Sequence, residues 1–380
     1  MPVVWAVTLT GILSNTLVAP ALPEIGEHFG VGAVGVALVV AFASLPGVVV
    51  APVIGVLADR FGRRTVLLPC LALFGAGGAV GMVAPGFAIL LGGRFLQGLG
   101  AAGLVNLAVV ILGDRFEGME RARAIGRNAA VLTVGLGVLP VAGGLLAQVG
   151  TWRLSFAPYS LAFVVALAAA RVLPPDRPAE VPPLREQLSG ARPYLSDPRN
   201  LAMTTVGFLA FLLVFGLGLT VLPLDLDRRF GVGSATRGLL LGLPALSSVV
   251  VSLRIGPLTQ RHGTWRLVLW GFAVLSTGYA VVAASPVAGL VGFGTLLWGL
   301  GEGLTIVPLQ AYAAGLAPAA QRGVVVAVWV AAVRAGQTVG PPLAGAVVSA
   351  TGTRAAFVAG SVAAAAVAAV GALGYRRRVR

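Results

Sequence analysis

The chain has 380 residues, of which 57% are hydrophobic and 11% are charged, and its 27 basic residues against 13 acidic ones give a formal net charge of +14. So few charges do not cover the surface of a water-soluble protein of this length, and the composition indicates an integral membrane protein. The basic residues, all arginine, lie in short clusters between apolar stretches, so we attribute the charge to membrane orientation and exclude a nucleic-acid partner.

The apolar stretches follow one another along the whole chain. The first, from about Val3 to Leu22, has no charged residue before it and no small-residue cleavage site, so we expect a retained helix and not a removed signal peptide. A helix needs roughly 20 apolar residues to cross a membrane. Twelve stretches qualify, at 3–23, 33–57, 65–84, 86–112, 124–148, 154–173, 201–224, 236–257, 266–284, 287–313, 323–349 and 355–375. Because backbone polar groups in lipid must be satisfied within the segment, the expected fold class is an all-α integral membrane protein with twelve transmembrane helices.

The arginines are unequally divided between the loops. With the N-terminus in the cytoplasm, the inward loops and tail hold eighteen of the 27 arginines, and the outward loops hold five, which include Arg237. This bias predicts a multi-pass protein of the cytoplasmic (inner) membrane with both termini in the cytoplasm.

The longest polar interruption lies near the middle of the chain, at 174–200, and is rich in proline and charge. We interpret it as a cytoplasmic linker between an N-terminal six-helix half at 1–173 and a C-terminal six-helix half at 201–380. A shift of 201 residues aligns the halves and superimposes Arg60 on Arg261, Pro140 on Pro341 and Phe156 on Phe357. Such a parallel pseudo-two-fold repeat is typical of transporters whose central site lies between two halves.

Three motifs follow in chain order. The stretch GVLADRFGRR at 55–64 lies between the second and third spans, and a degenerate copy at 256–263 has Gln260 in place of Asp59. The stretch RFLQGLG at 94–100 lies in the fourth span. The fifth span carries a set of small residues and a proline, Gly126, Gly135, Pro140, Gly143 and Gly144.

Together these motifs resemble the major facilitator superfamily over essentially the whole chain. The fifth-span set and the stretch TLVAPALPEI at 16–25 are similar to the twelve-span drug:proton antiporters of that superfamily. One position departs from the antiporter pattern, since Leu139 stands where the family has glycine before the proline, whereas the second half has Gly340 before Pro341.

The resemblance implies a gating role for the 55–64 loop. Asp59 would face the start of the eleventh span, where the helix dipole and Arg322 attract a carboxylate, and would hold the halves together in the outward-facing state. Gly55 and Gly62 would provide close packing and a tight turn. The remaining charges, Arg60, Arg63 and Arg64, would contact Asp114, Glu117 and lipid phosphates. The alternative is an ordinary loop that obeys the positive-inside rule.

The fifth-span glycines favour close approach of helices, and we expect Gly135, Gly143 and Gly144 to pack against the eighth span. Pro140 frees a backbone carbonyl and permits a bend. A further role as a hinge that opposes leakage is implied by the resemblance alone.

Three charged residues lie inside the apolar spans. Arg94 is expected to face the protein interior, either in the proton-linked or substrate-contacting role that the resemblance implies or as a structural arginine bonded to backbone carbonyls. Glu302 and Arg334 lie at similar depths in the tenth and eleventh spans. Glu302 is therefore predicted either to exchange a proton in the central cavity, where desolvation favours its neutral form, or to form a static ion pair with Arg334. Asp225, Asp227 and Glu24 are interpreted as solvated residues at the outer mouth.

The resemblance places the first, fourth, seventh and tenth spans around the cavity. The polar and aromatic candidates there and on the flanking spans are Asn15, Thr16, Asn106, Asn128, Thr220, Gln310, Tyr312, Trp329 and Gln337. This lining suits a neutral or cationic amphipathic solute, although asparagine, threonine and glutamine in spans are as often hydrogen-bond partners between helices.

The expected function is proton-coupled efflux of a drug-like or amphipathic small molecule by alternating access. Uptake of a metabolite or sugar, and a non-transporting sensor or lipid flippase on the same fold, stay open as alternatives. The sequence has no nucleophile elbow or phosphate loop, and its two histidines, His28 and His262, lie in different halves, so neither an enzyme nor a metal site is expected. The energy source would be the proton gradient without a cofactor, and the expected partners are the solute, protons and lipids around a monomer.

Overall fold

The computed structural model describes residues 1–174, 190, 192–315 and 319–379, with the side chains of 314, 319–323 and 375–379 left out. The first half contains α1 (Pro2–Thr16), η1 (Ala19–Ala21), α2 (Leu22–Phe29), α3 (Ala33–Phe61), α4 (Arg63–Val83), α5 (Phe87–Arg115), α6 (Gly118–Val149), η2 (Trp152–Ser160) and α7 (Leu161–Val172). The second contains α9 (Pro198–Leu213), η3 (Val214–Val221), α10 (Leu222–Phe230), α11 (Ser234–Ser252), α12 (Ile255–His262), α13 (Thr264–Ala284), α14 (Ala288–Gly315), α15 (Ala319–Thr351) and α16 (Thr353–Val379). Most of the predicted linker, at 175–189 and 191, lies outside the described residues.

The predicted number of membrane spans is confirmed. Among the described residues, 12 helical runs are long and apolar enough to cross a membrane. The first, Pro2–Phe29, joins α1, η1 and α2, and the seventh, Pro198–Phe230, joins α9, η3 and α10. Each run keeps its backbone hydrogen bonds internal, as the hydrocarbon core requires, even where prolines such as Pro46 and Pro140 lie inside a helix.

The backbone confirms the internal repeat. Gly30 and Gly231, which are related by the 201-residue shift, both adopt the left-handed conformation, with φ of 63° and 61°. Gly62 and Gly263, the next related pair, have φ of 97° and 77° with ψ of 154° and 152°, a region that only glycine adopts readily. The repeat therefore preserves the turns that join the spans and not only their hydropathy.

Repeat-related glycines also set the distance between helices. A Cβ added at Gly77 would lie 2.4 Å from the Gln97 nitrogen, and one added at Gly278 would lie 2.8 Å from the Trp298 nitrogen. The first contact joins α4 to α5, and the second joins α13 to α14. In both halves the missing side chain lets two backbones pack directly, which is how helices associate in a membrane.

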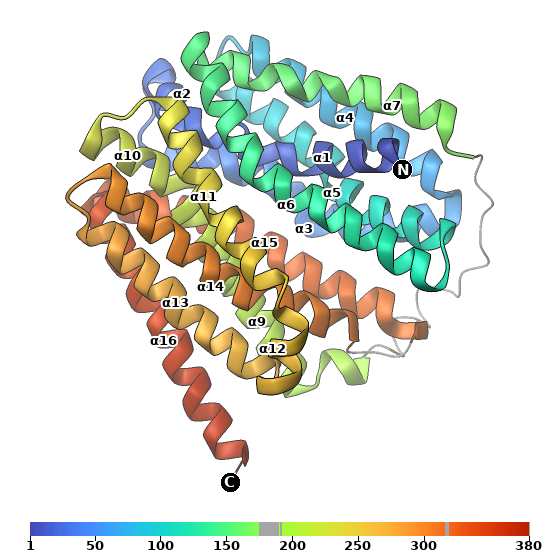
Figure 1. Ribbon diagram of the computed structural model, residues 1–380. Helices are drawn as coiled ribbons and strands as arrows, with labels where there is room; N and C mark the ends of the chain where they lie inside the picture. The colour runs from blue at the N-terminus through green and yellow to red at the C-terminus, as the bar shows by residue number, and fades with distance from the viewer. Residues whose placement is uncertain (175–189, 191, 316–318, 380) are drawn as a thin grey trace.

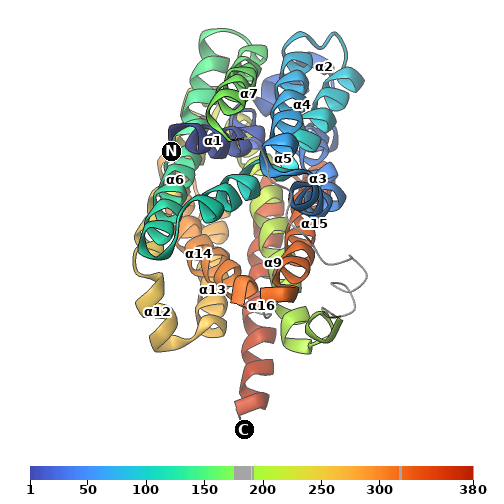
Figure 2. The same cartoon turned by 90° about the vertical axis from the view of Figure 1, so that its right-hand side faces the viewer.

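The two halves meet at one end of the bundle and spread apart at the other (Figures 1 and 2). Where they meet, α6 packs on α11, and a Cβ added at Gly144 would lie 2.2 Å from the Ser234 carbonyl oxygen. The start of α3 packs on the end of α15, since a Cβ at Gly345 would lie 2.8 Å from the Ala33 carbonyl oxygen. We call this the closed end.

The opposite end, which carries both chain termini in Figure 1, is called the open end. It contains the GVLADRFGRR turn at Gly62 and the related turn at Gly263. Three glycines near it, Gly55, Gly126 and Gly256, have no atom within 4 Å of an added Cβ. Contacts between the halves therefore extend from the closed end to about the middle of the helices, where Gly47 of α3 meets Arg334 of α15, and are not found at these three glycines.

Candidate functional site

Arg94 lies on α5 with none of its surface exposed. Its Nε donates to the Val39 carbonyl at 2.9 Å, and its Nη1 donates to the Ser14 carbonyl at 2.7 Å and to Gln97 Oε1 at 2.5 Å. Its Nη2 donates to Asn15 Oδ1. All these partners are neutral. Two backbone carbonyls and two side-chain amide oxygens thus hold the guanidinium of Arg94, which joins α5 to α1 and α3.

The surroundings of Arg94 include polar groups that the sequence did not single out. Asn15 Nδ2 donates to Ser44 Oγ at 3.2 Å, and the Tyr159 hydroxyl donates to the carbonyls of Leu13 and Ser14. Two buried atoms next to these bonds, Ser14 Oγ and Gln97 Nε2, have no partner in the described structure. The predicted cavity residue Asn15 is therefore part of the support of Arg94.

Glu302 is half-buried on α14 and faces the interior of the second half. Trp298, one turn earlier, packs on Gly218 of η3, and Gly299 packs on Pro244 of α11. Because residues three and four apart share a helix face, Glu302 lies over the gap between η3 and α11. No hydrogen bond or ion pair of its carboxyl is found within the described part of the chain. The buried Tyr279 hydroxyl and Trp298 Nε1, on the adjoining helix and the preceding turn, also have no partner there.

Arg334 is half-buried on α15 and points toward the other half. Its Nη1 donates to Gln337 Oε1 at 3.2 Å, and a Cβ added at Gly47 of α3 would lie 3.1 Å from its Cδ. Among the ion pairs of the described residues, none joins it to Glu302. The static Glu302–Arg334 pair is wrong for this conformation, because similar depth does not bring two side chains together when Arg334 faces α3 and Glu302 faces η3 and α11.

The other predicted cavity residues divide into two groups. Asn128 accepts from Thr8 Oγ1 at 2.8 Å, and the hydroxyls of Thr16 and Thr220 donate to carbonyls of their own helices. Tyr312 donates to Asn200 Oδ1 at 3.4 Å, and the buried Trp329 Nε1 has no partner in the described part. These side chains are occupied with packing or lie buried, whereas Asn106 and Gln310 are exposed.

The GVLADRFGRR turn carries an ion pair network within the first half. Arg63 bonds to Asp59, four residues earlier, and its Nε lies 3.2 Å from Asp114 Oδ2 on α5. Arg64 donates to the carbonyls of Ala170 and Leu173 at the end of α7, and Arg60 lies over the ring of Phe61. The expected contact with Asp114 is confirmed. Asp59 is directed to Arg63 in this conformation, and the side chain of Arg322 lies outside the described residues.

The two glycines of this turn behave differently. Gly62 has the glycine-specific backbone that was predicted for a tight turn. Gly55 was expected to pack closely, but an added Cβ would have no atom within 4 Å. The expectation for Gly55 is wrong in this conformation, because the position is exposed and no neighbouring helix approaches it.

The fifth-span set packs on two helices instead of one. Gly144 contacts Ser234 at the start of α11, the eighth span, as expected. Added Cβ atoms at Gly135 and Gly143 would instead lie 2.5 Å from Ile12 Cδ1 and 2.0 Å from the Leu17 carbonyl oxygen, both in the first span. The Pro140 carbonyl oxygen lies 2.3 Å from an added Cβ at Gly238 of α11. The prediction of packing against the eighth span therefore holds for Gly144 and Pro140 and is wrong for Gly135 and Gly143.

A charged cluster that sequence reasoning missed joins the halves at the closed end. Arg237, at the first turn of α11, is 1% exposed and bonds both to Glu24 of α2 and, at 2.7 Å, to Asp227 of α10. We call these three residues the Arg237 cluster. Two hydrogen bonds also join α11 of the second half to α6 of the first half. Ser234 Oγ donates to the Gly144 carbonyl at 2.9 Å, and the Ala235 nitrogen donates to Gln148 Oε1 at 3.1 Å. From the sequence, Arg237 was assigned to an outward loop. Its position inside the predicted eighth span, at the same end as the acids Glu24 and Asp227, could have indicated a buried ion pair.

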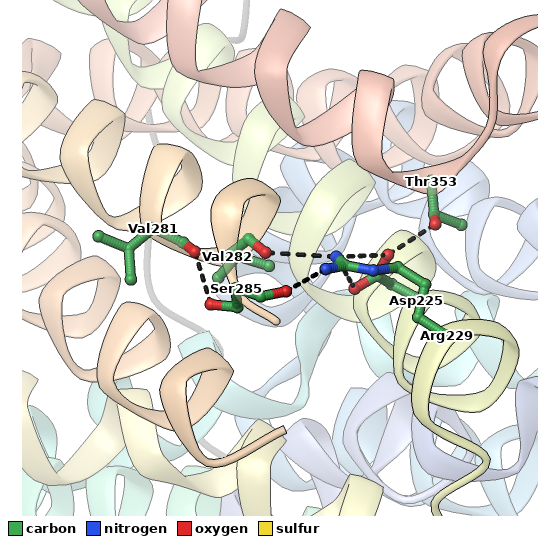
Figure 3. Close-up of polar contacts among 6 residues, drawn as sticks. All are labelled: Asp225, Arg229, Val281, Val282, Ser285 and Thr353. Carbon is green, nitrogen blue, oxygen red and sulfur yellow. Dashed lines mark hydrogen bonds and ion pairs between the residues drawn. The ribbon is translucent and has the colours of Figure 1, made fainter. Parts of the chain in front are cut away.

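Asp225 forms a second buried cluster, shown in Figure 3. Its side chain is fully buried, accepts from Thr353 Oγ1 at 2.6 Å, and pairs with Arg229 Nη1 at 3.0 Å. Arg229 also donates to the Ser285 carbonyl, so α10 is joined to the end of α13 and the start of α16. The interpretation of Asp225 as a solvated mouth residue is wrong, because its side chain is fully buried and is held by Arg229 of its own helix and Thr353 of α16. Glu24, which the repeat aligns with Asp225, instead pairs with Arg237 of the other half.

Comparisons with known proteins agree with this architecture. The family model described as Major Facilitator Superfamily matches residues 4–224 and 204–380. A tetracycline resistance protein, class C, of Escherichia coli is 30% identical over 317 residues, which cover 78% of this chain and 76% of that protein. A bacillibactin exporter of Bacillus subtilis is 28% identical over 266 residues, or 66% of each chain. The chain spans only 27% of the length of two further transporters that it matches.

A solved structure shares the fold. The bacterial homologue of the human lysosomal transporter Spinster, in an inward-facing and occupied conformation, has a TM-score of 0.81 and 18% sequence identity. The match covers 98% of this chain and 96% of that one. At this identity the likeness concerns the fold alone, and it extends over both halves.

Proposed function

Because the chain belongs to the Major Facilitator Superfamily, we propose that it exports a small organic solute across the cytoplasmic membrane in exchange for protons. Membership confirms the predicted class, a multi-pass membrane transporter and not an enzyme. The solute, the direction and the coupling ion belong to the proposal, and so does a monomer whose termini face the cytoplasm.

The arrangement of the halves supports alternating access. The closed end is sealed by backbone contacts between α6 and α11 and by the Arg237 cluster, while the halves spread at the other end (Figure 1). The arginine-rich loops lie at the open end, which the positive-inside rule assigns to the cytoplasm. The conformation is then inward-open, ready to take up a solute from the cytoplasm or to release one there.

Efflux is favoured over uptake by the relatives. The relatives include a tetracycline resistance protein and a bacillibactin exporter, and resistance and export both agree with outward transport. The packing of Gly144 and Pro140 on α11, where the halves meet, supports a role of the fifth-span set in closing that end.

The observation that carries the coupling proposal is the isolated carboxyl of Glu302. An acid inside a membrane span is costly when charged, and the described residues give it neither an arginine nor a hydrogen-bond donor. Isolated carboxyls inside membrane spans are the groups that typically relay protons in transporters, so Glu302 is the residue we assign to proton exchange. Arg94 does not compete for this role, because its four neutral partners hold it in place.

Everted membrane vesicles energised with a proton gradient test the proposal. Addition of tetracycline should release protons from the vesicle lumen, and Glu302→Gln should abolish that release because the amide binds no proton. Glu27→Gln, the same change at an exposed site of α2, is the matched control and should behave as wild type. Proton-driven accumulation that persists in Glu302→Gln excludes this residue as the carrier.

The same assay separates the alternatives. Proton uptake together with solute identifies a symporter, and the absence of proton movement with a broad panel of solutes favours a sensor or a flippase. Neither outcome is compatible with the proposed antiport.

A further inference from the structure

We propose that Arg334 binds a negatively charged oxygen group of the transported solute, so that the protein carries organic anions. This inference rests on the proposed transport function and names the class of solute that the site between the halves selects. The polar lining residues by themselves suit a neutral or cationic solute. The small number of hydrogen bonds made by Arg334 leads us to expect an anionic solute instead.

The guanidinium of Arg334 has few acceptors among the described residues. An arginine has five N–H donors in a planar fork. The described structure gives Arg334 a single side-chain acceptor, Gln337 Oε1, at 3.2 Å. Arg94, an arginine inside a span of the other half, has four acceptors around it. The difference identifies Arg334 as the intramembrane arginine that retains donors for a ligand.

Among the described residues, no acid pairs with Arg334. Glu302, the acid of the neighbouring span, makes no ion pair with it, and the described acids that do pair with arginine lie at the two ends of the bundle. An arginine inside a membrane is costly, and a paired charge or a water-filled space lowers the cost. A carboxylate or phenolate that enters between the halves supplies the missing charge and accepts two N–H bonds at once.

The position of Arg334 suits contact with a solute. It lies on the face of α15 that also carries Gly345, whose contact with Ala33 seals the closed end. On the opposite helix, Gly47 leaves room for the side chain, since an added Cβ would lie 3.1 Å from Arg334 Cδ. Arg334 is half-buried and extends from one half to the surface of the other. A solute bound there touches both halves.

Equilibrium binding of two dyes with one scaffold tests the inference. Fluorescein is an anion and rhodamine 6G a cation at neutral pH, and both carry the same xanthene ring. Fluorescence polarisation with the purified full chain in lipid nanodiscs should show tighter binding of fluorescein. Arg334→Gln should weaken fluorescein binding by about tenfold or more, the usual scale of a lost charged hydrogen bond, and leave rhodamine 6G no weaker.

Two further variants separate binding from structure. Arg334→Lys keeps the charge without the fork and should retain part of the fluorescein affinity. Arg354→Gln removes the same charge at an exposed site of the closed end and should bind as wild type. Equal thermal unfolding midpoints of the variants show that the loss concerns the ligand and not the fold.

The inference is overturned if wild type prefers rhodamine 6G, binds neither dye, or binds fluorescein equally well after Arg334→Gln. It is also overturned if Arg354→Gln causes the same loss. No proton gradient is present, so a failure of proton coupling through Glu302 leaves this measurement unchanged, and the two proposals fail separately.

Discussion

The two ends of the bundle both carry an arginine between two acids, but in opposite environments. At the closed end Arg237 is 1% exposed, and its acids, Glu24 and Asp227, come from different halves. At the open end Arg63 is 25% exposed, and its acids, Asp59 and Asp114, come from the same half. Only the first arrangement holds the halves together.

Burial gives the two clusters different energies. An exposed ion pair contributes about 0.2–1 kcal/mol because water and salt screen it, whereas removal of one partner from a buried pair leaves an unpaired charge. The Arg237 cluster is therefore costly to disturb, and the Asp59–Arg63 pair is easily exchanged for another partner. To change conformation, the protein must break the buried Arg237 cluster at the closed end. At the open end, the exposed pair of Asp59 with Arg63 can be exchanged for a contact with the other half at little cost.

Removal of Arg237 is the strongest test of this contrast. Arg237→Gln removes the buried cation and leaves Glu24 and Asp227, which are 35% and 44% exposed, facing each other, so the free energy of unfolding should fall by about 1.5–3 kcal/mol. The thermal midpoint of the purified protein should show the loss. Arg228→Gln, a change at an exposed arginine of the same end, is the control and should shift stability little. A loss of similar size in both variants would show that net charge, and not the cluster, stabilises the closed end.

The glycine contact of α6 with α11 provides a second, smaller test. Gly144→Val places side-chain atoms against the Ser234 carbonyl oxygen, which an added Cβ already approaches to 2.2 Å. The helices must separate, and overpacking of this kind costs about 1–3 kcal/mol. Gly126→Val, on the same helix but with no atom within 4 Å, is the matched control. Thiol labelling of cysteines introduced along α11 should increase in Gly144→Val and stay unchanged in Gly126→Val. Equal labelling in both variants would show that the Gly144 contact does not exclude water from the closed end.

The sequence predicted the membrane spans and the repeat because both follow from local properties. Hydropathy locates the helices, and the glycines at the turns, such as Gly62 and Gly263, recur at a constant shift because the backbone there excludes other residues. The contact of Arg63 with Asp114 was also predictable, since both lie in loops of one face.

The contacts between helices were not predictable in the same way. Glu302 and Arg334 share a depth, but their partners depend on the rotation of α14 and α15, which hydropathy does not fix. Asp225 and Arg237 lie at the ends of apolar stretches, where charge alone suggests solvation. Asp225 is nevertheless buried with Arg229 of its own helix and Thr353 of α16, and Arg237 with Glu24 of α2 and Asp227 of α10. The sequence therefore located the charged residues in the membrane but not their partners.

Asp59 gives the test with the smallest effect on stability and the clearest effect on motion. Its pair with Arg63 is exposed, so Asp59→Asn should change the free energy of unfolding by no more than about 1 kcal/mol and leave membrane insertion intact. We expect transport in everted vesicles to slow, because closure of the open end brings α3 toward the N-terminus of α15, where the helix dipole favours a carboxylate. Asp114→Asn removes the other acid of Arg63 without this approach and should slow transport less. Wild-type transport by Asp59→Asn would exclude the gating role, and an equal loss in both variants would assign it to Arg63 instead.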